Sequence, residues 1–309
     1  MSVGMECEGT EPRIARPPAT GRREAPSCRP AFETSLNIRY DFIMLELKHI
    51  GITFNANTPD EHTALKDINL CIKKGNFITV IGSNGAGKST LYNVIAGTLQ
   101  PTKGHILLDR NEDGSEVDIT HDAEFKRARY IGRIFQNPLL GTAGKMSLED
   151  NMVICSRKGN KGLRISLNNK LRQHFREQLS VLDMGLEDRL GDNVDQFSGG
   201  QRQALTLLMA VMSRPDLLLL DEHTAALDPT NAEIVMNLTL RFAEEYGLTV
   251  MMVTHNMQHA LDYGNRLLMM DKGEIILDIG EKEKKALTVK KMVALFHTIK
   301  DSNDGLLLQ

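Results

Sequence analysis

The stretch GSNGAGKST at residues 82–90 has the residue types and spacing of a loop that binds a nucleoside triphosphate. It fits the pattern G-x-x-x-x-G-K-[ST], whose glycines let backbone N–H groups approach the phosphates closely. Lys88 is expected to contact the β- and γ-phosphates, and the Ser89 hydroxyl is expected to bind Mg²⁺. The residues expected to form this cradle are Gly82, Ser83, Asn84, Gly85, Ala86, Gly87, Lys88, Ser89 and Thr90.

The segments on either side of the loop are those that such a cradle requires. FITVIG at 77–82 is a short apolar run typical of a buried strand. STLYNVIAGTL at 89–99 has apolar residues at positions 91, 94, 95 and 99, which is a helical spacing. The alternative, a glycine-rich turn with a surface lysine, would not need this order of strand, loop and helix. Kinases, GTPases, motors and transporters all remain possible at this point.

A second candidate for phosphate chemistry is LLLLDE at 217–222. Four consecutive leucines predict a strand buried on both faces in a parallel sheet. Asp221, at the end of that strand, is expected to reach the Mg²⁺ shell, and Glu222 is expected to polarise a water for attack on the γ-phosphate. The alternative is a solvated loop that carries two charges.

A second anion-binding element is predicted at QFSGGQRQ, residues 196–203. The hydroxyl of Ser198, the backbone N–H groups of the glycines and the N-terminal end of the following helix all favour a negative charge. One nucleotide does not need two phosphate cradles from one chain. This element is therefore expected to serve the nucleotide held by a second copy of the chain. Its expected contacts are Ser198, Gly199, Gly200 and Gln201.

At this point the sequence closely resembles the ATP-binding-cassette ATPases, whose signature motif LSGGQ is written FSGGQ here at 197–201. Further motifs of that family follow the same pattern. Gln136 in RIFQNP resembles the Q-loop glutamine, Asp228 in AALD ends a D-loop, and His255 in VTHN resembles the switch histidine. The resemblance covers about residues 44–300. For His255, the alternative is a polar residue with no catalytic role.

The resemblance implies an α/β fold. The expected architecture is a RecA-like P-loop NTPase core with an antiparallel β subdomain and an inserted α-helical subdomain at about 137–211. It also implies ATP and Mg²⁺ as cofactors and a head-to-tail dimer that closes on two ATP molecules. The catalytic residues that it implies are Glu222, His255, Gln136 and Lys88, and the metal ligands are Ser89, Gln136 and Asp221.

Two positions depart from the family pattern. The residue after the Walker B glutamate is usually proline and is His223 here. Proline only stiffens that turn, so catalysis is expected to survive. Phe54 is the candidate for the aromatic residue that stacks on adenine, although NTPDEHT at 57–63 lengthens the loop beyond it. The alternative for Phe54 is a core residue of an outer strand.

Composition restricts the possible partners and compartments. The 309 residues carry a net charge of −3, from 37 basic and 40 acidic residues, which gives no electrostatic case for nucleic acid as a partner. None of the four cysteines are paired at C-x-x-C spacing, which favours neither zinc nor a disulfide framework and indicates a reduced, cytosolic compartment. No apolar run approaches the roughly 18 residues that span a bilayer. A membrane role must then go through a partner protein.

Residues 1–43 differ in composition from the rest of the chain. They contain five of the ten prolines, six arginines and no lysine, and they show no apolar periodicity. Such a segment buries too little surface to offset its ordering entropy. MLELKHIGITF then opens a strand pattern at Met44, which predicts that translation begins there and that 1–43 is a mis-annotated extension. The alternative is a genuine disordered tail. Residues 301–309 are assigned to a short C-terminal tail.

The remaining family members can be separated by length and motif. Only 110 positions separate Lys88 from Ser198, too few for the coiled coil of the chromosome-maintenance members, and one cassette excludes the two-cassette translation factors. A nucleoside kinase would lack FSGGQ. The prediction is an ATP-hydrolysing transporter subunit, peripheral at the cytoplasmic face of the bacterial membrane, with separate integral membrane permease subunits. Leu139 and Leu140 are candidate permease contacts; the alternative is that they pack within the helical subdomain.

The direction of transport depends on the resemblance alone. The runs LLLLDEHTAALDP and RIFQNPLLGTAGKMSLEDN look like a group of bacterial importer ATPases related to amino-acid uptake systems. These work with an extracytoplasmic substrate-binding protein. The chain ends soon after a predicted helix at 288–299, so no C-terminal regulatory domain of the maltose-importer sort is expected. An exporter, a lipoprotein-release ATPase and a non-transport ATPase are the alternatives, and the sequence does not indicate the cargo.

Overall fold

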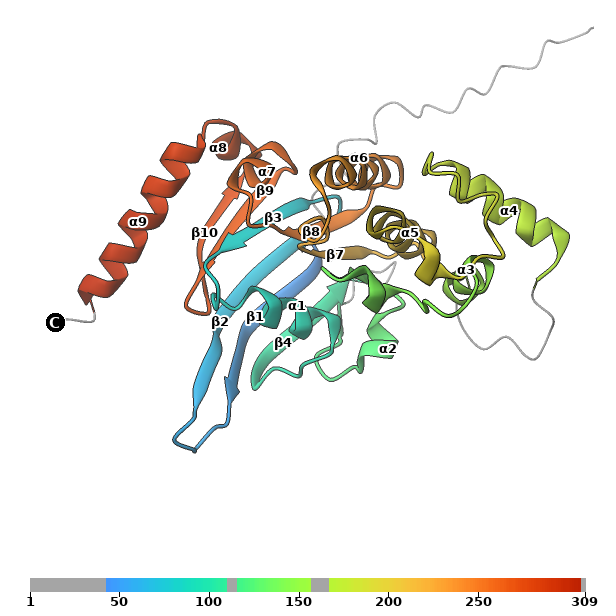
Figure 1. Cartoon of the computed structure of the whole chain (residues 1–309). Coiled ribbons are helices and arrows are strands. Elements are labelled where there is room, and N and C mark those ends of the chain that lie inside the picture. The colour runs from blue at the N-terminus through green and yellow to red at the C-terminus, as the bar shows by residue number, and fades with distance from the viewer. Residues whose placement is uncertain (1–42, 110–115, 157–166, 307–309) are drawn as a thin grey trace, which may run out of the picture. The chain divides into compact units, whose positions relative to one another are not determined.

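The computed structural model describes residues 43–109, 116–156 and 167–306. The predictions made for residues 1–42 lie outside this part of the chain. Two sheets and the helices around them make up the described structure (Figure 1).

The first sheet is antiparallel and has the strand order β2-β1-β4-β5. Its strands are β1 (Ile43–Phe54), β2 (His62–Lys73), β4 (Lys103–Asp109) and β5 (Glu116–Asp118). The strand pattern predicted from Met44 is therefore confirmed. Apolar side chains along β1 and β2 are buried against the rest of the molecule, as expected for a sheet with one covered face.

The second sheet has the order β10-β9-β3-β8-β7-β6, and only its β9–β10 pair is antiparallel. Its strands are β3 (Phe77–Gly82), β6 (Ile131–Ile134), β7 (Leu217–Asp221), β8 (Thr249–Val253), β9 (Arg266–Asp271) and β10 (Glu274–Gly280). In a parallel sheet the carboxyl ends of the strands lie at one edge. The segments that follow β3, β7 and β8 therefore meet there, and these segments carry the predicted phosphate chemistry.

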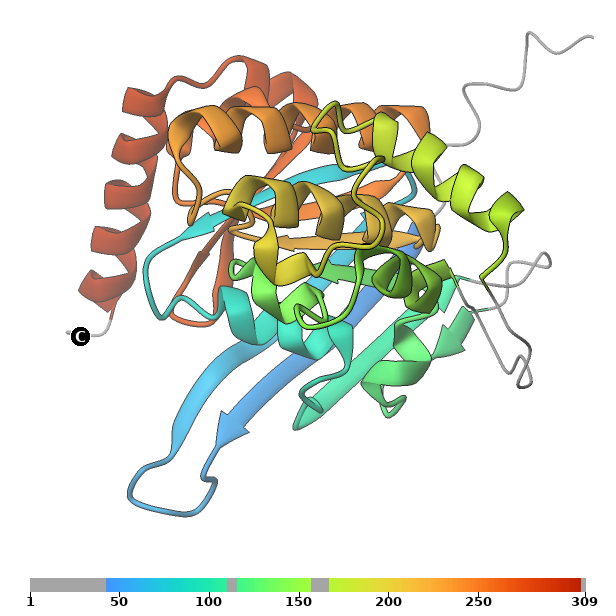
Figure 2. The same cartoon turned by 45° about the vertical axis from the view of Figure 1, so that its right-hand side comes forward.

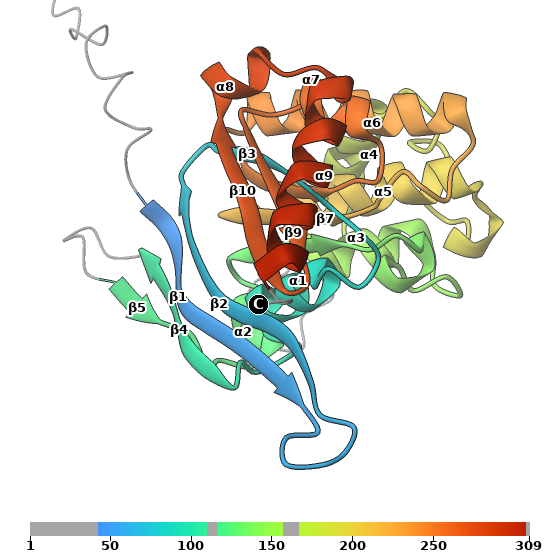
Figure 3. The same cartoon turned by 90° about the vertical axis from the view of Figure 1, so that its left-hand side faces the viewer.

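Helix α1 (Lys88–Ala96) lies between the two sheets (Figure 3) and contributes to the core that they share. The four leucines of β7 show how both faces of the sheet are covered. Leu217 and Leu219 face the core around α1, whereas Leu218 and Leu220 face a second core on the opposite side. The predicted buried parallel strand is confirmed, and its run of leucines follows from burial on both faces.

The second core joins that opposite face of the sheet to the helices of the predicted insertion and to the helix that follows β7 (Figure 2). Helix α6 (Pro229–Glu245) follows β7 and packs against α5. The helical segments inside the predicted insertion at 137–211 are η1 (Pro138–Gly141), α3 (Leu148–Ser156), α4 (Asn169–Ser180), η2 (Val194–Gln196) and α5 (Gly199–Met212). The expected α/β fold with an antiparallel sheet and added helices is confirmed.

The remaining helices flank the sheets. They are α2 (Glu124–Arg127), α7 (Met257–Asp262), α8 (Glu281–Lys285) and α9 (Val289–Leu306). A third, smaller core joins α7 and α9 to the β9 side of the mixed sheet. Helix α9 ends at Leu306 and so extends into 301–309, the segment predicted to be a tail. Within the described ranges, no helix is long and apolar enough to cross a bilayer.

Candidate nucleotide site

The glycine loop joins β3 directly to α1, as predicted. Gly87 precedes the helix with a φ of 98°, and a Cβ there would lie 2.8 Å from the carbonyl oxygen of Ala64. Glycine is needed at this position for both reasons. No side chain caps α1 among the described residues. The first N–H groups of the helix are thus left to a ligand rather than to the protein's own side chains.

Lys88 folds back over the loop. Its ammonium donates hydrogen bonds to the carbonyl oxygens of Gly82, at 2.8 Å, and Ser83, at 2.9 Å. Burial lowers the pKa of Lys88, and the nearby carboxylates of Glu222 and Asp221 oppose this shift. The positive charge is therefore held inside the cradle, close to both acidic residues that follow β7.

The loop is also fixed from β9. The Ser83 hydroxyl donates to Asp271 Oδ1 at 2.9 Å, and Asp271 is buried. This contact holds the start of the loop against the neighbouring strand. Ser83 was predicted as a phosphate contact, but in this structure its hydroxyl is engaged with Asp271.

Glu222 and His255 meet at the same edge of the sheet. Glu222 follows β7, His255 follows β8, and these two strands are parallel neighbours. His255 Nε2 lies 2.5 Å from Glu222 Oε1, which is ion-pair distance. Glu222 has a φ of 49°, an uncommon left-handed conformation for a residue other than glycine. Two of the four residues with predicted catalytic roles, Glu222 and His255, are thus in direct contact.

Asp221 has a partner that the sequence analysis missed. Arg133, on β6, places Nη2 3.5 Å from Asp221 Oδ2 and donates from Nη1 to Asn93 Oδ1 at 2.7 Å. Its guanidinium also lies over the ring of Phe135, 4.6 Å from the centroid. A single arginine within the apolar strand YIGRIF was the available signal. One carboxylate oxygen of Asp221 is therefore directed toward a cation.

These elements surround one depression of about 390 Å³. The residues that line it are Phe54, His62, Ala64, Asn84, Gly85, Ala86, Gly87, Lys88, Ser89, Thr90, Glu222 and His255. The pocket therefore combines most of the glycine loop with the two catalytic candidates and with the end of the first hairpin.

Phe54 lies at the mouth of this depression. Its side chain is 37% exposed, so the alternative of a core residue is wrong. It pairs across the hairpin with His62, which lines the same depression. Neighbouring side chains of an antiparallel pair lie on one face, so both rings can meet a flat ligand. Nothing in the sequence pattern singled out His62.

The chemistry of the pocket fits Mg²⁺ bound together with phosphates. A serine hydroxyl and an aspartate carboxylate are hard oxygen donors, and Mg²⁺ is commonly held by one or two such groups plus phosphate oxygens. Ser89 lies at the start of α1 and Asp221 at the end of β7, and α1 contacts β7 directly. Within the described ranges, no group of three or more His, Cys, Asp or Glu residues forms a separate metal site.

The signature segment forms the start of α5. The Ser198 hydroxyl accepts from the Gln201 N–H at 3.2 Å, and Gln201 Oε1 accepts from the Ser198 N–H at 3.1 Å. This reciprocal pair is a capping box, which satisfies two donors at once. The predicted helix start is confirmed, but Ser198, Gly199, Gly200 and Gln201 do not line the depression around the glycine loop.

Five more predicted residues are not among those that line the depression, namely Gly82, Ser83, Gln136, Asp221 and Asp228. Gln136 is exposed just after β6 and is not a lining residue. Asp228 caps α6, with Oδ1 accepting from the Asn231 N–H at 3.1 Å and Oδ2 accepting from Asn231 Nδ2 at 2.6 Å. The single chain therefore does not bring Gln136 or Asp228 to the pocket.

His223 is fully inside the protein rather than a solvated turn residue. It is 1% exposed, and Nε2 lies 3.0 Å from the Thr239 hydroxyl on α6. Burial lowers the pKa of His223 to about 4, so the ring is neutral near pH 7.

Leu139 and Leu140 are exposed on η1, with 49% and 66% of their surfaces accessible. The alternative in which they pack within the helical part is wrong. Met146 and Ile154 are also exposed apolar side chains of this part of the chain. Four exposed apolar residues thus lie between positions 139 and 154.

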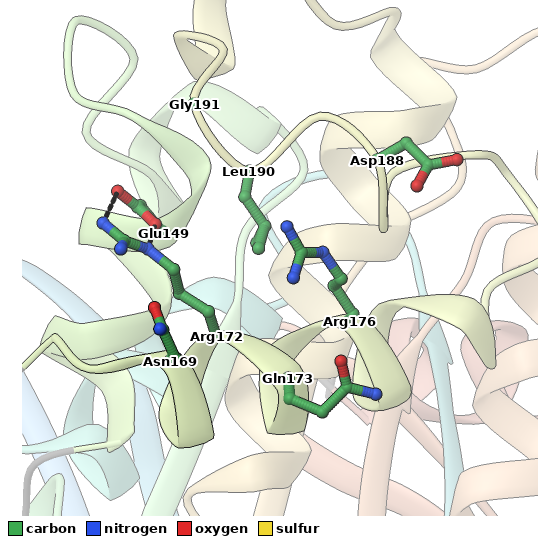
Figure 4. A pocket seen from close by; sticks show the side chains of 8 residues that line it. All are labelled: Glu149, Asn169, Arg172, Gln173, Arg176, Asp188, Leu190 and Gly191. Atoms are coloured by element: carbon green, nitrogen blue, oxygen red, sulfur yellow. Dashed lines mark hydrogen bonds and ion pairs between the residues drawn. The ribbon is translucent and has the colours of Figure 1, made fainter.

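A second depression lies in the helical part, between α3, α4 and the segment 188–191 (Figure 4). Its character is different, because arginine and carboxylate side chains face each other across it. Arg172 donates from Nε to Glu149 Oε2 at 2.8 Å and from Nη2 to Glu149 Oε1 at 3.2 Å. Its charges are partly neutralised within the protein, and it has neither a glycine loop nor a nucleophile, so the nucleotide site is the depression at the sheet edge.

Comparison with known proteins agrees with this geometry. A family model described as ABC transporter matches residues 65–225. The tyrosine transport ATP-binding protein of Clostridioides difficile (strain R20291) is 41% identical over 258 residues, which cover 82% of this chain and 98% of that protein. The methionine import ATP-binding protein MetN of Streptococcus pyogenes serotype M1 is 33% identical over 252 residues, covering 79% and 68% of the two chains.

Solved structures show the same fold. The dimeric ATP-binding cassette MJ0796 in a post-hydrolysis state with ADP and Pi aligns with a TM-score of 0.62 at 28% identity, over 77% of this chain and 99% of that one. The ADP conformation of the cassette MJ1267 aligns with a TM-score of 0.65 at 26% identity, over 82% and 98%. The motifs, the pocket and these matches agree: the chain belongs to the ABC transporter family and is one of its ATP-hydrolysing ATP-binding subunits.

Proposed function

We propose that the depression at the sheet edge binds Mg-ATP and that Glu222 is the base that activates the attacking water. The observation that carries this proposal is the 2.5 Å contact between Glu222 and His255 beside Lys88 and the glycine loop. Lys88 would exchange the carbonyls of Gly82 and Ser83 for oxygens of the β- and γ-phosphates. Glu222 would accept a proton from water, while His255 holds that carboxylate and contacts the γ-phosphate.

The other contacts follow from the placement of residues in or beside the pocket. Ser89, which lines it, and Asp221, at the end of the neighbouring strand β7, would hold Mg²⁺, which supplies charge neutralisation at the phosphates. Phe54 would stack on adenine, since it is half-exposed at the mouth of the pocket. Gln136 lies outside the pocket of this single chain, so its proposed contact with the metal and γ-phosphate requires movement of the segment that follows β6.

A second copy of the chain completes each site in this proposal. The signature residues lie away from the chain's own glycine loop, and the matched cassette MJ0796 is dimeric. In a head-to-tail dimer, Ser198 and its two glycines would contact the γ-phosphate held by the partner. Asp228 would lie at the same interface. Closure would then depend on ATP, because its γ-phosphate bridges both surfaces.

The exposed apolar residues between 139 and 154 are the proposed contact with integral membrane permease subunits. They follow directly on Gln136, so a change at the nucleotide can reach them through a short segment. The chain would then lie peripherally at the cytoplasmic face of a bacterial membrane. Closing and opening can move a permease only if that permease binds the two states differently.

Import of an amino acid is the proposed direction and cargo class. The support is similarity to proteins described as tyrosine transport and methionine import ATP-binding proteins. An extracytoplasmic substrate-binding protein is part of this proposal. No observation on this chain favours export or a non-transport role over import.

The test is reconstitution with membrane proteins encoded beside this chain. Proteoliposomes with ATP outside, next to the ATPase subunit, should move a radiolabelled amino acid toward the ATP-containing side when the binding protein is present on the other side. A Glu222→Gln complex is the matched control and should transport nothing. Movement away from the ATP side would overturn import, and ATP turnover that is indifferent to every co-encoded membrane protein would overturn the transporter role.

A further inference from the structure

The residue after Glu222 is anchored to a different element from Glu222 itself. His223 Nε2 lies 3.0 Å from Thr239 Oγ1, and Thr239 Oγ1 lies 2.8 Å from the carbonyl oxygen of Val235. A hydroxyl has only one proton, and a backbone carbonyl can only accept. The Thr239 hydroxyl therefore donates to Val235 and accepts from His223, which must carry its proton on Nε2.

This chain of bonds is enclosed. His223 and Thr239 are each 1% exposed, so water cannot replace either partner. The neutral His223 ring needs a partner for its N–H, and loss of that partner would leave a buried donor unsatisfied. The bond is thus a fixed connection between the turn after β7 and the middle of α6.

Glu222 needs such a connection because its backbone is in an unfavourable region. A left-handed φ of 49° at a residue other than glycine is unfavourable and persists only when its surroundings enforce it. The local backbone bonds are few. The Glu222 N–H donates to Val253 O at a long 3.3 Å, and the Ala225 N–H donates to Glu222 O at 2.9 Å.

We propose that the His223–Thr239 hydrogen bond is a positioning device that holds Glu222 in its left-handed conformation and so aims its carboxylate at His255 and the attacking water. The restraint on the backbone of this turn then comes from a side chain on a separate element, α6. The proposal rests on the proposed role of Glu222 as the base. His223 does not line the nucleotide pocket, so it acts through Glu222 and not on ATP.

The placement on α6 adds a second consequence. Helix α6 begins at Pro229, directly after its cap Asp228, and Asp228 is proposed to face the partner subunit. The hydrogen bond therefore connects the catalytic turn to the same helix that starts at the proposed dimer interface. A shift of α6 on closure would be transmitted to Glu222 through Thr239 and His223.

The experiment compares four single variants in the full chain with wild type. Thr239→Val removes the hydroxyl at constant shape, and Thr239→Ser restores it. His223→Leu removes the donor, and His223→Gln restores an amide N–H near the Nε2 position. We expect Thr239→Val and His223→Leu to lower the kcat for ATP about tenfold with KM within about twofold, because a base displaced by about 1 Å loses up to 10²-fold. Thr239→Ser and His223→Gln should keep most of the kcat.

Two further measurements keep the test decisive. In a variant that carries both Thr239→Val and His223→Leu, the loss in kcat should be no larger than in either single variant, because each change breaks the same hydrogen bond. Hydrogen exchange of peptides that contain the Ala225 amide should accelerate in Thr239→Val, with the remaining peptides as a folding control. Folded Thr239→Val and His223→Leu proteins with wild-type kcat would overturn the proposal. If Glu222→Gln, assayed in parallel, also turns over ATP normally, the proposed base itself is wrong.

Discussion

The N-termini of α1 and α5 are two candidate anion sites with the same chemistry, but they differ in whether a side chain of the chain itself caps the helix. At α1, the preceding residue is Gly87 and no side chain caps the helix among the described residues. At α5, Ser198 and Gln201 cap each other's backbone groups. The first terminus presents donors to a ligand of its own chain, whereas at the second the N–H groups of Ser198 and Gln201 are already bonded within the chain.

This difference suggests how a site completed by two chains can remain stable in each chain alone. A capping interaction is worth about 1 kcal/mol, which a phosphate oxygen with its charge can replace. The α5 terminus is therefore stable alone, yet can accept the γ-phosphate of a partner at little cost. The α1 terminus, next to a buried lysine and two carboxylates, is suited to bind nucleotide before any dimer forms.

The largest expected effect separates hydrolysis from binding at the α1 side. Glu222→Gln keeps the shape of the side chain but removes the base, and kcat should fall by about 10²–10⁴-fold. ATP should still bind, so a closed dimer should accumulate in Mg-ATP and be seen by size exclusion with light scattering. Asp221→Asn is the control that should not dimerise, because it weakens the metal shell. A Glu222→Gln protein that stays monomeric in Mg-ATP would contradict the proposal that ATP closes the dimer.

The next effect concerns affinity at the α1 terminus. Lys88→Ala removes a buried cation that the structure places inside the loop, 2.8 Å from Gly82 O. Hydrogen bonds from charged groups are worth about 1.5–3 kcal/mol, so the Kd for ATP should rise about 10- to 100-fold. Titration with a fluorescent ATP analogue measures this. Ser198→Ala should leave the Kd for ATP unchanged. An equal loss of ATP affinity in both variants would contradict the view that only the α1 terminus binds the chain's own nucleotide.

Two glycine substitutions compare the helix starts directly. Gly87→Ala introduces a Cβ 2.8 Å from Ala64 O in a left-handed backbone and should cost about 1–3 kcal/mol of stability and impair ATP binding. At Gly199 the nearest atom to a new Cβ is Leu227 Cδ2 at 3.5 Å, an ordinary contact. Gly199→Ala should therefore melt like wild type and bind ATP normally, but hydrolyse more slowly. A destabilised Gly199→Ala protein would refute this reading of α5.

The smallest effect is expected at Phe54. Aromatic stacking contributes about 0.5–1.5 kcal/mol beyond burial, so Phe54→Leu should weaken ATP binding by up to about tenfold, and Phe54→Trp should retain it. The same titration measures both variants. If the affinity of Phe54→Leu for ATP is unchanged, Phe54 does not stack on adenine, and another lining residue such as His62 makes that contact.

Much of the fold and half of the site were predictable because the signals were local. Four leucines followed by Asp221 specify a buried parallel strand, and GSNGAGKST specifies a strand, loop and helix in sequence. Glu222 and His255 were each predicted from a local strand ending, but their direct contact follows from the parallel pairing of β7 and β8, which the sequence alone did not predict. Helix α9 was underestimated because its polar last turns lack an apolar pattern.

What the sequence did not predict depends on long-range packing. Arg133 reaches Asp221 across neighbouring strands, and His223 reaches Thr239 on the following helix, 16 positions away. His223 was expected only to replace a stiffening proline, and its partner could not be identified before the path of α6 was known. The engaged state of Ser198 was also not predictable, because a capping box and an anion site have the same residues.

The central claim is that each ATP lies between the α1 terminus of one chain and the α5 terminus of another. The most direct test mixes Lys88→Ala with Ser198→Arg, two variants that are each inactive alone. In the mixed dimer, one site combines both defects and the other combines two intact halves. Random mixing gives heterodimers in about half of the dimers, so ATPase activity should return to about a quarter of wild type. Mixed samples that remain inactive, although both proteins are folded and exchange subunits, would contradict the shared site.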